Sequence, residues 1–423
     1  MTGWLDAVFP RRALLEGDRR LLHLFIGRTL GGMGFAITIP FLSLYLHSER
    51  GVVMTVVGGM FFLSAFFGAA AQLLGGGWTD RYGRKVVMVG AQIGRGAIFL
   101  GLAAAVLFHA PIAWIAALVC GSSFFGRLFE PPSGAMVADL VEGERRSEAY
   151  AILRVGGNLG WAIGPALGGF LATLSYWSLF LISAAMMFAS GLLLGAKVSE
   201  TSPRHRKGAP LGAAPETLRL GELGVAFRDR MFLRYCLTTL LLFTVMGQLI
   251  STLSVYVVDW AGRSKAELGY LYSLNGLLVV LVQFPAARAL LRFRMTTALI
   301  VGSLLYAVGY AMMGLGSGFP LLAAAMFVVT IGEITSTPAS MNLVARFSSE
   351  EFRGRYMGAF GLASSFGWSV GPLVGGVLLD MAKGKAVLLW SLIASLTVLG
   401  AVGFWDLRRR IDRTMDQNRE ATT

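Results

Sequence analysis

Two glutamates, Glu130 and Glu333, lie deep inside long apolar stretches, where ionisable side chains are uncommon. An apolar environment raises the pKa of a carboxyl group, and a neighbouring arginine lowers it. A carboxyl that moves between two such environments takes up a proton in one and releases it in the other. The sequence places no basic residue beside Glu333, so Glu333 is our first candidate for proton coupling. A carboxyl that is only hydrogen-bonded is the alternative.

Glu130 is the second candidate, and Arg127 precedes it by three residues. Positions three apart share one face of a helix, so Arg127 is expected to hold Glu130 ionised and to take part in proton coupling. A purely structural ion pair between the two side chains is the alternative. Other polar side chains recur at helical spacing and are candidates for lining a substrate cavity, namely Thr330 and Thr337 around Glu333, and Thr244, Gln248 and Ser251 in another apolar stretch.

Arginines also fall within the apolar stretches. A charged side chain in hydrocarbon costs about 3 kcal/mol or more unless it has a partner. Arg154 and Arg234 lie near the ends of their stretches, where a long side chain can reach the membrane surface. The deep ones are Arg28, Arg95 and Arg127. They outnumber the two deep acids, which keeps counter-charges for an anionic substrate open as an alternative function.

The apolar stretches account for most of the chain. Hydrophobic residues make up 55% of its 423 residues and charged residues only 14%. Runs of about 20 apolar residues are long enough to cross a membrane as helices. The sequence therefore predicts an all-α polytopic membrane protein with twelve transmembrane helices, at 21–46, 52–73, 85–108, 111–138, 148–173, 176–195, 231–258, 267–288, 295–315, 320–345, 355–380 and 386–406.

One phrase occurs twice, as GWAIGPALGG at Gly160–Gly169 and as GWSVGPLVGG at Gly367–Gly376. The repeat predicts two pseudo-symmetric six-helix halves, 1–196 and 231–423, joined by a polar linker, 197–230, which a short amphipathic helix near 216–228 interrupts. Parallel repeats of this kind are a common plan of secondary transporters. Small residues four apart let helices approach closely, and a proline kinks its helix, so tight packing and a moving hinge are both open for Gly160, Gly164, Pro165, Gly168 and Gly169.

The net charge of +13 is distributed unevenly among the predicted loops. With both termini inside, the inner segments carry most of the Lys and Arg, as the positive-inside rule requires. The basic excess is then expected to face anionic lipid, and no nucleic-acid partner is expected. We expect a multi-pass protein of the plasma (inner) membrane with both termini in the cytoplasm.

The loop between the second and third predicted spans reads GGWTDRYGRKVVM, and the chain thereby resembles the major facilitator superfamily. The superfamily signature G-x-x-x-D-R-x-G-R-K is matched by Gly76, Asp80, Arg81, Gly83, Arg84 and Lys85. Apart from the resemblance, Gly83 supplies a tight turn, Asp80 can accept bonds from a helix N-terminus, and the arginines can pair with Asp139 or Glu142 as a gate. A solvated turn that only sets topology is the alternative.

The phrase at Gly160–Gly169 is similar to a signature of the superfamily's proton-linked antiporters, here the twelve-helix drug/proton group. Weaker similarities surround Arg127 in SFFGRLFEPPSGA and Glu333 in TIGEITSTP. The resemblance implies the major facilitator fold and a central cavity lined by the first, fourth, seventh and tenth helices, on which the polar residues above and Phe35 fall. The first helix departs from many multidrug members, because it has Arg28 and no acid.

These features predict a secondary active transporter that exports amphipathic small molecules or drugs in exchange for protons by alternating access. A carrier of an anionic metabolite and a proton-coupled uptake symporter are the alternatives, and the antiporter signature speaks against the second. No enzyme is expected, because phosphate-loop and nucleophile-elbow motifs are lacking and the four histidines are too scattered for a metal site. The expected partners are substrate, protons and lipid; no cofactor beyond the proton gradient is expected, and the carrier is expected to act as a monomer.

Overall fold

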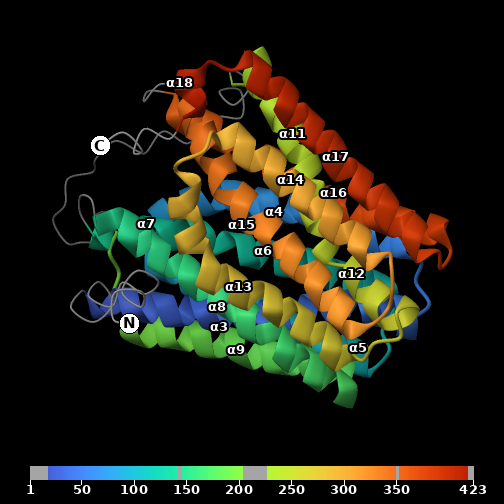
Figure 1. Ribbon diagram of the computed structural model, residues 1–423. Helices are drawn as coiled ribbons and strands as arrows, with labels where there is room; N and C mark the ends of the chain where they lie inside the picture. The colour runs from blue at the N-terminus through green and yellow to red at the C-terminus, as the bar shows by residue number, and fades with distance from the viewer. Residues whose placement is uncertain (1–17, 142–144, 203–225, 349–351, 418–423) are drawn as a thin grey trace, which may run out of the picture. The chain divides into compact units, whose positions relative to one another are not determined.

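The computed structural model describes residues 18–141, 145–202, 226–348 and 352–417, and within these ranges it contains helices and no strand (Figure 1). In the described residues, eleven helices are long and apolar enough to cross a membrane. The fold class predicted from the sequence is therefore confirmed. Most of the predicted linker and its amphipathic helix, as well as Glu142, lie outside the described residues.

Six of the predicted spans are helices of the N-terminal part of the chain. The third of these follows the second after the single residue Gly83, and the fourth is divided in two at Phe129. The helices are α3 (Arg19–Leu44, continued by a wider turn at Tyr45–Glu49), α4 (Met54–Tyr82), α5 (Arg84–Leu107), α6 (Ile112–Leu128) with α7 (Glu130–Leu140), α8 (Arg145–Leu174) and α9 (Tyr176–Lys197).

The other six spans follow in the C-terminal part. They are α11 (Arg230–Met246) with a tight turn at Gly247–Leu249, α12 (Thr252–Val255) and a wider turn at Tyr256–Trp260; α13 (Lys265–Leu290); α14 (Met295–Met313); α15 (Phe319–Phe347); α16 (Arg353–Ala382); and α17 (Ala386–Arg410), with the short α18 (Arg413–Asp416) at the end.

Helix α8 covers the predicted span 148–173 but is not among the eleven apolar ones. Its 30 residues include six glycines, Asn158 and Pro165, all of which contribute little apolar surface. The residues that make α8 suitable for close packing are thus the ones that lower its hydropathy.

Two of the predicted helices, 111–138 and 231–258, are interrupted, which the sequence analysis did not anticipate. Phe129 separates α6 from α7, and Pro131 and Pro132 lie in the first turn of α7, just after Glu130. Proline lacks the N–H that an inner helical turn needs but is well suited to a first turn, so a new helix begins there. The second interruption, at Gly247–Ser251, follows α11.

The described chain divides into two compact units that cut across the predicted halves. The described residues of unit 1 are 18–45, 60–141, 145–202 and 265–280, and those of unit 2 are 46–59, 226–264, 281–348 and 352–417. In unit 1, a Cβ atom added to Gly169 would lie 2.6 Å from the carbonyl oxygen of Lys265, so the start of α13 packs on α8. In unit 2, Asp380 of α16 accepts the backbone N–H groups of Met54 and Thr55 at the start of α4.

The repeated glycine phrase lies where helices touch closely. In unit 1, Figure 1 shows α3 beside α8, and a Cβ atom on Gly160 would lie 2.5 Å from the backbone nitrogen of Met33. In unit 2, a Cβ atom on Gly371 of α16 would lie 2.6 Å from the carbonyl oxygen of Thr244. Glycine permits this approach of backbones. The packing function of the phrase is thus visible in both units, whereas its hinge function stays a prediction.

We expect Gly160→Ala to lower the free energy of unfolding by about 1–3 kcal/mol, because the added methyl group overlaps the backbone of α3. The measurement is equilibrium unfolding of the purified protein in detergent. Gly90→Ala is the matched control, since this helical glycine of α5 faces open space. The control should gain up to about 1 kcal/mol from helix propensity. Equal effects of the two substitutions would contradict the close α3–α8 contact.

Candidate functional site

Four charged side chains of unit 1 come together from α3, α5, α6 and α7. Arg28 of α3 forms an ion pair with Glu130, the first residue of α7, with 2.7 Å between Nη1 and Oε1. The Arg28 side chain is 28% exposed and that of Glu130 is 41% exposed, so the pair is only partly covered. The Arg28 guanidinium carbon also lies 5.9 Å from the centre of the Phe129 ring.

The predicted partner of Glu130, Arg127, is not the one that the structure shows. Among the described residues Glu130 forms an ion pair with Arg28 and none with Arg127. Arg127 lies in the last turn of α6, and its aliphatic stem lies against Gly68 of α4, where an added Cβ atom would be 3.0 Å from Arg127 Cγ. Helical spacing places Arg127 and Glu130 on one face, but tertiary packing brings Arg28 of α3 within reach of the Glu130 carboxylate, and this partner cannot be predicted from spacing along one helix.

Arg95 of α5 is held by aromatic rings and a glycine. Its guanidinium carbon lies 4.4 Å from the ring centre of Phe35 and 5.8 Å from that of Phe99. The backbone of Gly126 approaches so closely that a Cβ atom there would lie 2.7 Å from the same carbon. The Nε–H donates to Ser122 Oγ at 3.4 Å. Cation–π contacts of this kind stabilise a guanidinium without neutralising it.

The cluster carries more positive than negative charge. Arg95 interacts electrostatically with Arg127, Arg28 and Glu130. Three guanidinium groups thus surround one carboxylate, and within the described part of the chain no ion pair neutralises Arg95 or Arg127. Each unpaired charge in a membrane segment costs about 3 kcal/mol of free energy. A cluster with only a structural role would therefore not be expected to hold this surplus of positive charge.

The second candidate acid, Glu333, lies on α15 in unit 2. Its side chain is half-buried, and it interacts electrostatically with the fully buried Tyr306 of α14. Thr330 is buried and donates to the carbonyl oxygen of Met326, whereas the Thr337 hydroxyl is buried without a hydrogen-bond partner. Sequence reasoning missed Tyr306, because the proximity of Tyr306 to Glu333 depends on how α14 packs on α15.

The predicted stripe on α11 does not continue as one helical face. Thr244, Gln248 and Ser251 are all buried, and the tight turn at Gly247–Leu249 separates the first from the last. The Gln248 amide donates to the carbonyl oxygens of Thr244 and Gly371 and accepts from Thr252. In unit 2 the Gln248 side chain therefore joins the end of α11 to α16, and the role of the three side chains as cavity residues stays a prediction.

The loop between α4 and α5 forms an ordered charge cluster. Gly83 has φ +94°, the left-handed region that the predicted tight turn requires. Arg84 Nε lies 2.6 Å from Asp139 Oδ2, which confirms one of the two predicted partners, although the N–H direction is outside hydrogen-bond geometry. Asp80 lies 3.8 Å from Arg84 Nη1. Of the other signature residues, Arg81 lies over the Tyr82 ring, and Gly76 faces open space.

The acceptor at the start of α5 is Glu200, not Asp80 as the sequence analysis expected. Its carboxylate accepts the backbone N–H groups of Arg84 and Lys85 at 2.9 and 3.0 Å. Burial alone would raise the pKa of Glu200, but these bonds and those from Thr201 and Ser202 outweigh it and lower the pKa below the ordinary 4.5. The sequence signal that was missed is an acid three residues after α9.

Unit 2 also has a carboxylate bound at the start of a helix, and no sequence motif predicted it. The fully buried Asp416 of α18 accepts from Arg294 Nε at 2.7 Å and from the backbone N–H of Thr296 at 2.8 Å, at the start of α14. Glu200, which follows α9, thus binds the first turn of α5, and Asp416, which follows α17, binds the first turn of α14. Anions are favoured at that position by the helix dipole.

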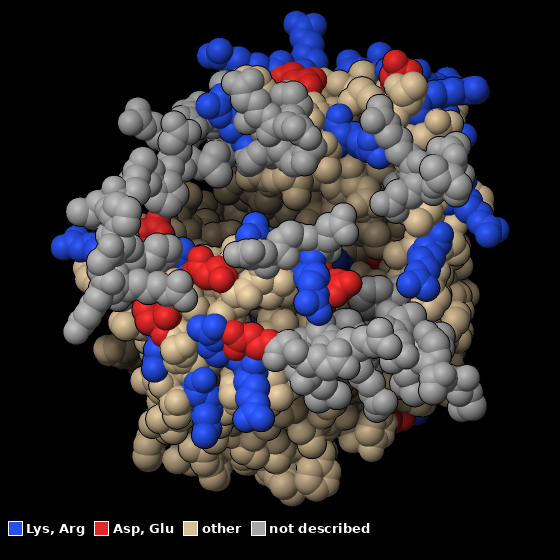
Figure 2. Space-filling model, turned by 90° about the vertical axis from the view of Figure 1, so that its left-hand side faces the viewer, with Lys and Arg blue, Asp and Glu red and all other residues tan. Residues whose placement is uncertain are grey.

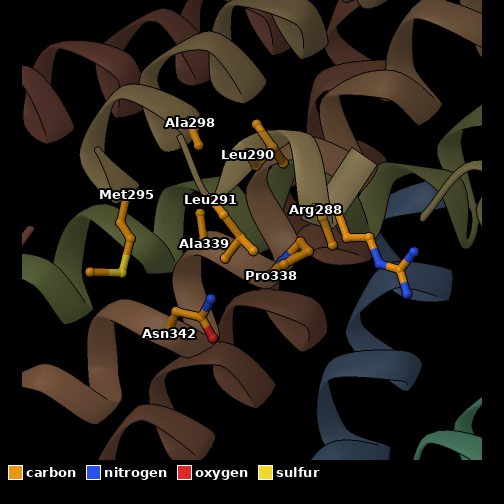
Figure 3. Close-up of a pocket in the computed structure, with 9 residues that line it drawn as sticks. Arg288, Leu290, Leu291, Met295, Ala298, Pro338, Ala339 and Asn342 are labelled. Atoms are coloured by element: carbon orange, nitrogen blue, oxygen red, sulfur yellow. The ribbon is translucent and has the colours of Figure 1, made fainter. Parts of the chain in front are cut away.

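One small apolar pocket lies in unit 2, between the end of α13, the start of α14 and the Pro338 region of α15. Its volume is about 160 Å³, and Figure 3 shows the Arg288 guanidinium pointing away from the apolar lining residues. Pockets for drug-sized ligands are roughly 300–1,000 Å³. None of the residues predicted for the site lines this pocket, and its size does not suit the predicted substrate.

Comparison with known proteins agrees with the helical arrangement. A family profile described as Major Facilitator Superfamily matches residues 24–262 and 250–421. The multidrug resistance protein MdtH of Klebsiella pneumoniae is 27% identical over 386 residues, covering 90% of this chain and 92% of that protein. A Na⁺, Li⁺, K⁺/H⁺ antiporter of Planococcus maritimus is 27% identical over 384 residues, covering 85% and 89%.

Solved structures show the same fold. The nucleoside transporter NupG aligns with a TM-score of 0.78 at 16% identity, covering 92% of this chain and 99% of that one. A POT family transporter in complex with 5-aminolevulinic acid aligns with a TM-score of 0.76 at 14% identity, covering 94% and 97%. The chain therefore belongs to the Major Facilitator Superfamily and is a multi-pass membrane transporter.

We expect Glu200→Gln to reduce stability at neutral pH by about 1 kcal/mol, the usual contribution of a helix cap. The lowered pKa means that the carboxylate stabilises the fold above the ordinary pKa of 4.5 and that this contribution disappears as the pH falls through the lower, folded-state pKa. Thermal unfolding of wild type and variant across this pH range measures the difference, with Glu148→Gln as an exposed control. A difference that grows on acidification would contradict the cap.

We also expect Arg28 and Glu130 to be coupled. In a double-mutant cycle with Arg28→Gln and Glu130→Gln, the coupling free energy should be about 1 kcal/mol or more, because the pair is partly removed from water. The exposed pair Arg410–Asp406 of α17 is the matched control, with an expected value of about 0.5 kcal/mol or less. Additive effects of the Arg28 and Glu130 substitutions would show that the ion pair does not form.

Proposed function

We propose that the chain exports amphipathic small molecules in exchange for protons by alternating access. The observation that carries this proposal is a half-buried carboxyl, Glu333, within a membrane-spanning helix of a transporter fold. Two relatives support it by name, a multidrug resistance protein and a cation/proton antiporter. The glycine-rich α8, which is similar to the antiporter signature, supports it as well.

In our proposal Glu333 is the group that binds and releases the exchanged proton. A carboxyl that faces apolar side chains favours its protonated form, and the same carboxyl exposed to water favours its ionised form. Alternating access moves the site between exposure to one side of the membrane and exposure to the other. In our proposal Glu333 releases its proton on the inner side, and the emptied carrier then binds substrate for export.

The orientation in the membrane follows from charge. Basic residues occupy the last turns of α4 and α9 in unit 1 and, in unit 2, of α13, α15 and α17; Lys and Arg side chains are blue in Figure 2. The positive-inside rule supports a cytoplasmic location for these helix ends and for both termini. We propose that the carrier lies in the plasma (inner) membrane and acts as a monomer.

We expect Glu333→Gln to abolish pH-gradient-driven transport, because glutamine cannot carry a proton. The measurement uses the purified full chain in liposomes, an imposed pH gradient of either sign and a fluorescent amphipathic dye. Asp406→Asn, an exposed change on α17, is the matched control and should transport like wild type. Quenching of an internal pH-sensitive dye reports proton flux in the same vesicles.

Two results would overturn this proposal. Transport by the wild type that ignores the pH gradient would exclude proton coupling altogether. Full coupling in Glu333→Gln would show that the proton binds elsewhere, and Glu130→Gln would then be tested in the same vesicles.

A further inference from the structure

We propose that unit 1 carries a binding site for the anionic group of an amphipathic substrate, with Arg95 as its anchor and Arg127 as a second contact. This inference names the substrate class of the exporter proposed above and in that sense rests on the proposed function. The binding step itself can be measured separately from transport.

The first support is the way in which Arg95 is held. Phe35 and Phe99 lie against its guanidinium, and Gly126 leaves room for it, so the group is positioned by packing and not by an opposite charge. A guanidinium has five N–H donors, and the described contact of Arg95 is the one from Nε to Ser122. The remaining planar fork matches the oxygen atoms of a carboxylate, sulfonate or phosphate.

The second support is the charge balance. Glu130 forms its ion pair with Arg28, so within the described part of the chain the cluster has no carboxylate for Arg95 or Arg127. Arg95 lies within electrostatic range of both other arginines, which repel it. An anion that enters the cluster relieves this repulsion, whereas a cation increases it. The cluster therefore selects for negative charge.

The third support is the apolar surface beside the charge. Phe35, which contacts Arg95, also packs edge-on against Trp161 of α8, with 6.1 Å between the ring centres. The ring centre of Phe129 lies 5.9 Å from the Arg28 guanidinium carbon. Aromatic side chains next to a guanidinium suit a ligand in which a planar or hydrophobic moiety is attached to the anionic group. The structure thus favours a lipophilic anion over a small inorganic one.

The ion pair between Arg28 and Glu130 defines the part that Glu130 plays. Neutralising Glu130 releases Arg28 and adds one more unpaired guanidinium to the cluster, which strengthens anion binding. A proton on Glu130 would consequently accompany an anion and would not compete with it. The proton that is exchanged for substrate is for this reason assigned to Glu333, and Glu130 is a positioning residue for the arginines.

The test compares two dyes that share one ring system, sulforhodamine B as the net anion and tetramethylrhodamine ethyl ester as the cation. Binding of each to the purified full chain in detergent is measured by fluorescence anisotropy, for wild type, Arg95→Gln, Arg95→Lys and Glu130→Gln. Arg410→Gln on the exposed side of α17 is the control for charge removal elsewhere. Size-exclusion chromatography confirms that each variant is folded.

We expect wild type to bind the anion more tightly than the cation. Arg95→Gln should weaken anion binding by roughly tenfold or more, as expected for the loss of one charge-assisted contact, and leave cation binding unchanged or improved. Arg95→Lys keeps the charge but loses the planar fork, so it should retain only part of the anion affinity, and Glu130→Gln should tighten anion binding severalfold. Arg410→Gln should match wild type.

The proposal is overturned if wild type prefers the cation, or if Arg95→Gln and Arg95→Lys both leave anion affinity unchanged. Should Arg95→Gln fail to fold, the tightening by Glu130→Gln decides, because a site without anion preference would not show it. The proposed function fails differently, namely when the pH gradient drives neither dye across the vesicle membrane. Anion binding without gradient-driven transport would retain the site and reject proton-coupled export.

Discussion

The close approach of α3 to α8 is the contact on which the rest of unit 1 depends. Gly160 and Gly164 bring the two backbones so near that an added Cβ atom would lie 2.5 Å from Met33 N at the first position and 2.8 Å from Ala36 Cβ at the second. Helix α3 is thereby held at a definite depth and rotation. Because the same helix carries Arg28 and Phe35, this contact sets where the charge partner of Glu130 and the aromatic support of Arg95 lie.

Both units use an acid from a later segment to hold the first turn of an earlier helix. Glu200 binds the start of α5, and Asp416 binds the start of α14. The N–H groups of a first helical turn lack intrahelical partners, and a carboxylate satisfies them while interacting with the helix dipole. In unit 1 the same segment also reaches Asp139, since Thr201 donates to it at 2.7 Å. The signature loop is therefore one part of a network that includes the end of α9.

Our proposals assign different roles to two charged groups of the membrane segments. Glu333 lies on α15 within electrostatic range of a buried tyrosine, and we propose it as the group that exchanges protons. Glu130 is occupied by Arg28 and leaves the neighbouring arginines in surplus. In such a carrier, Glu333 would couple transport to the proton gradient, and the arginines around Glu130 would set the substrate preference. Such a division agrees with our proposals for proton-coupled export and for an anionic substrate group.

The sequence by itself determined the class of fold, the approximate positions of the long helices, the internal repeat and the tight turn at Gly83. These follow from local properties, namely hydropathy, glycine spacing and backbone geometry, which neighbouring residues impose. The partner of Glu130, the caps Glu200 and Asp416, and the nearness of Tyr306 to Glu333 were decided only by the tertiary structure. Each of these joins residues from different helices, and helical periodicity says which residues share a face but not which face another helix will meet.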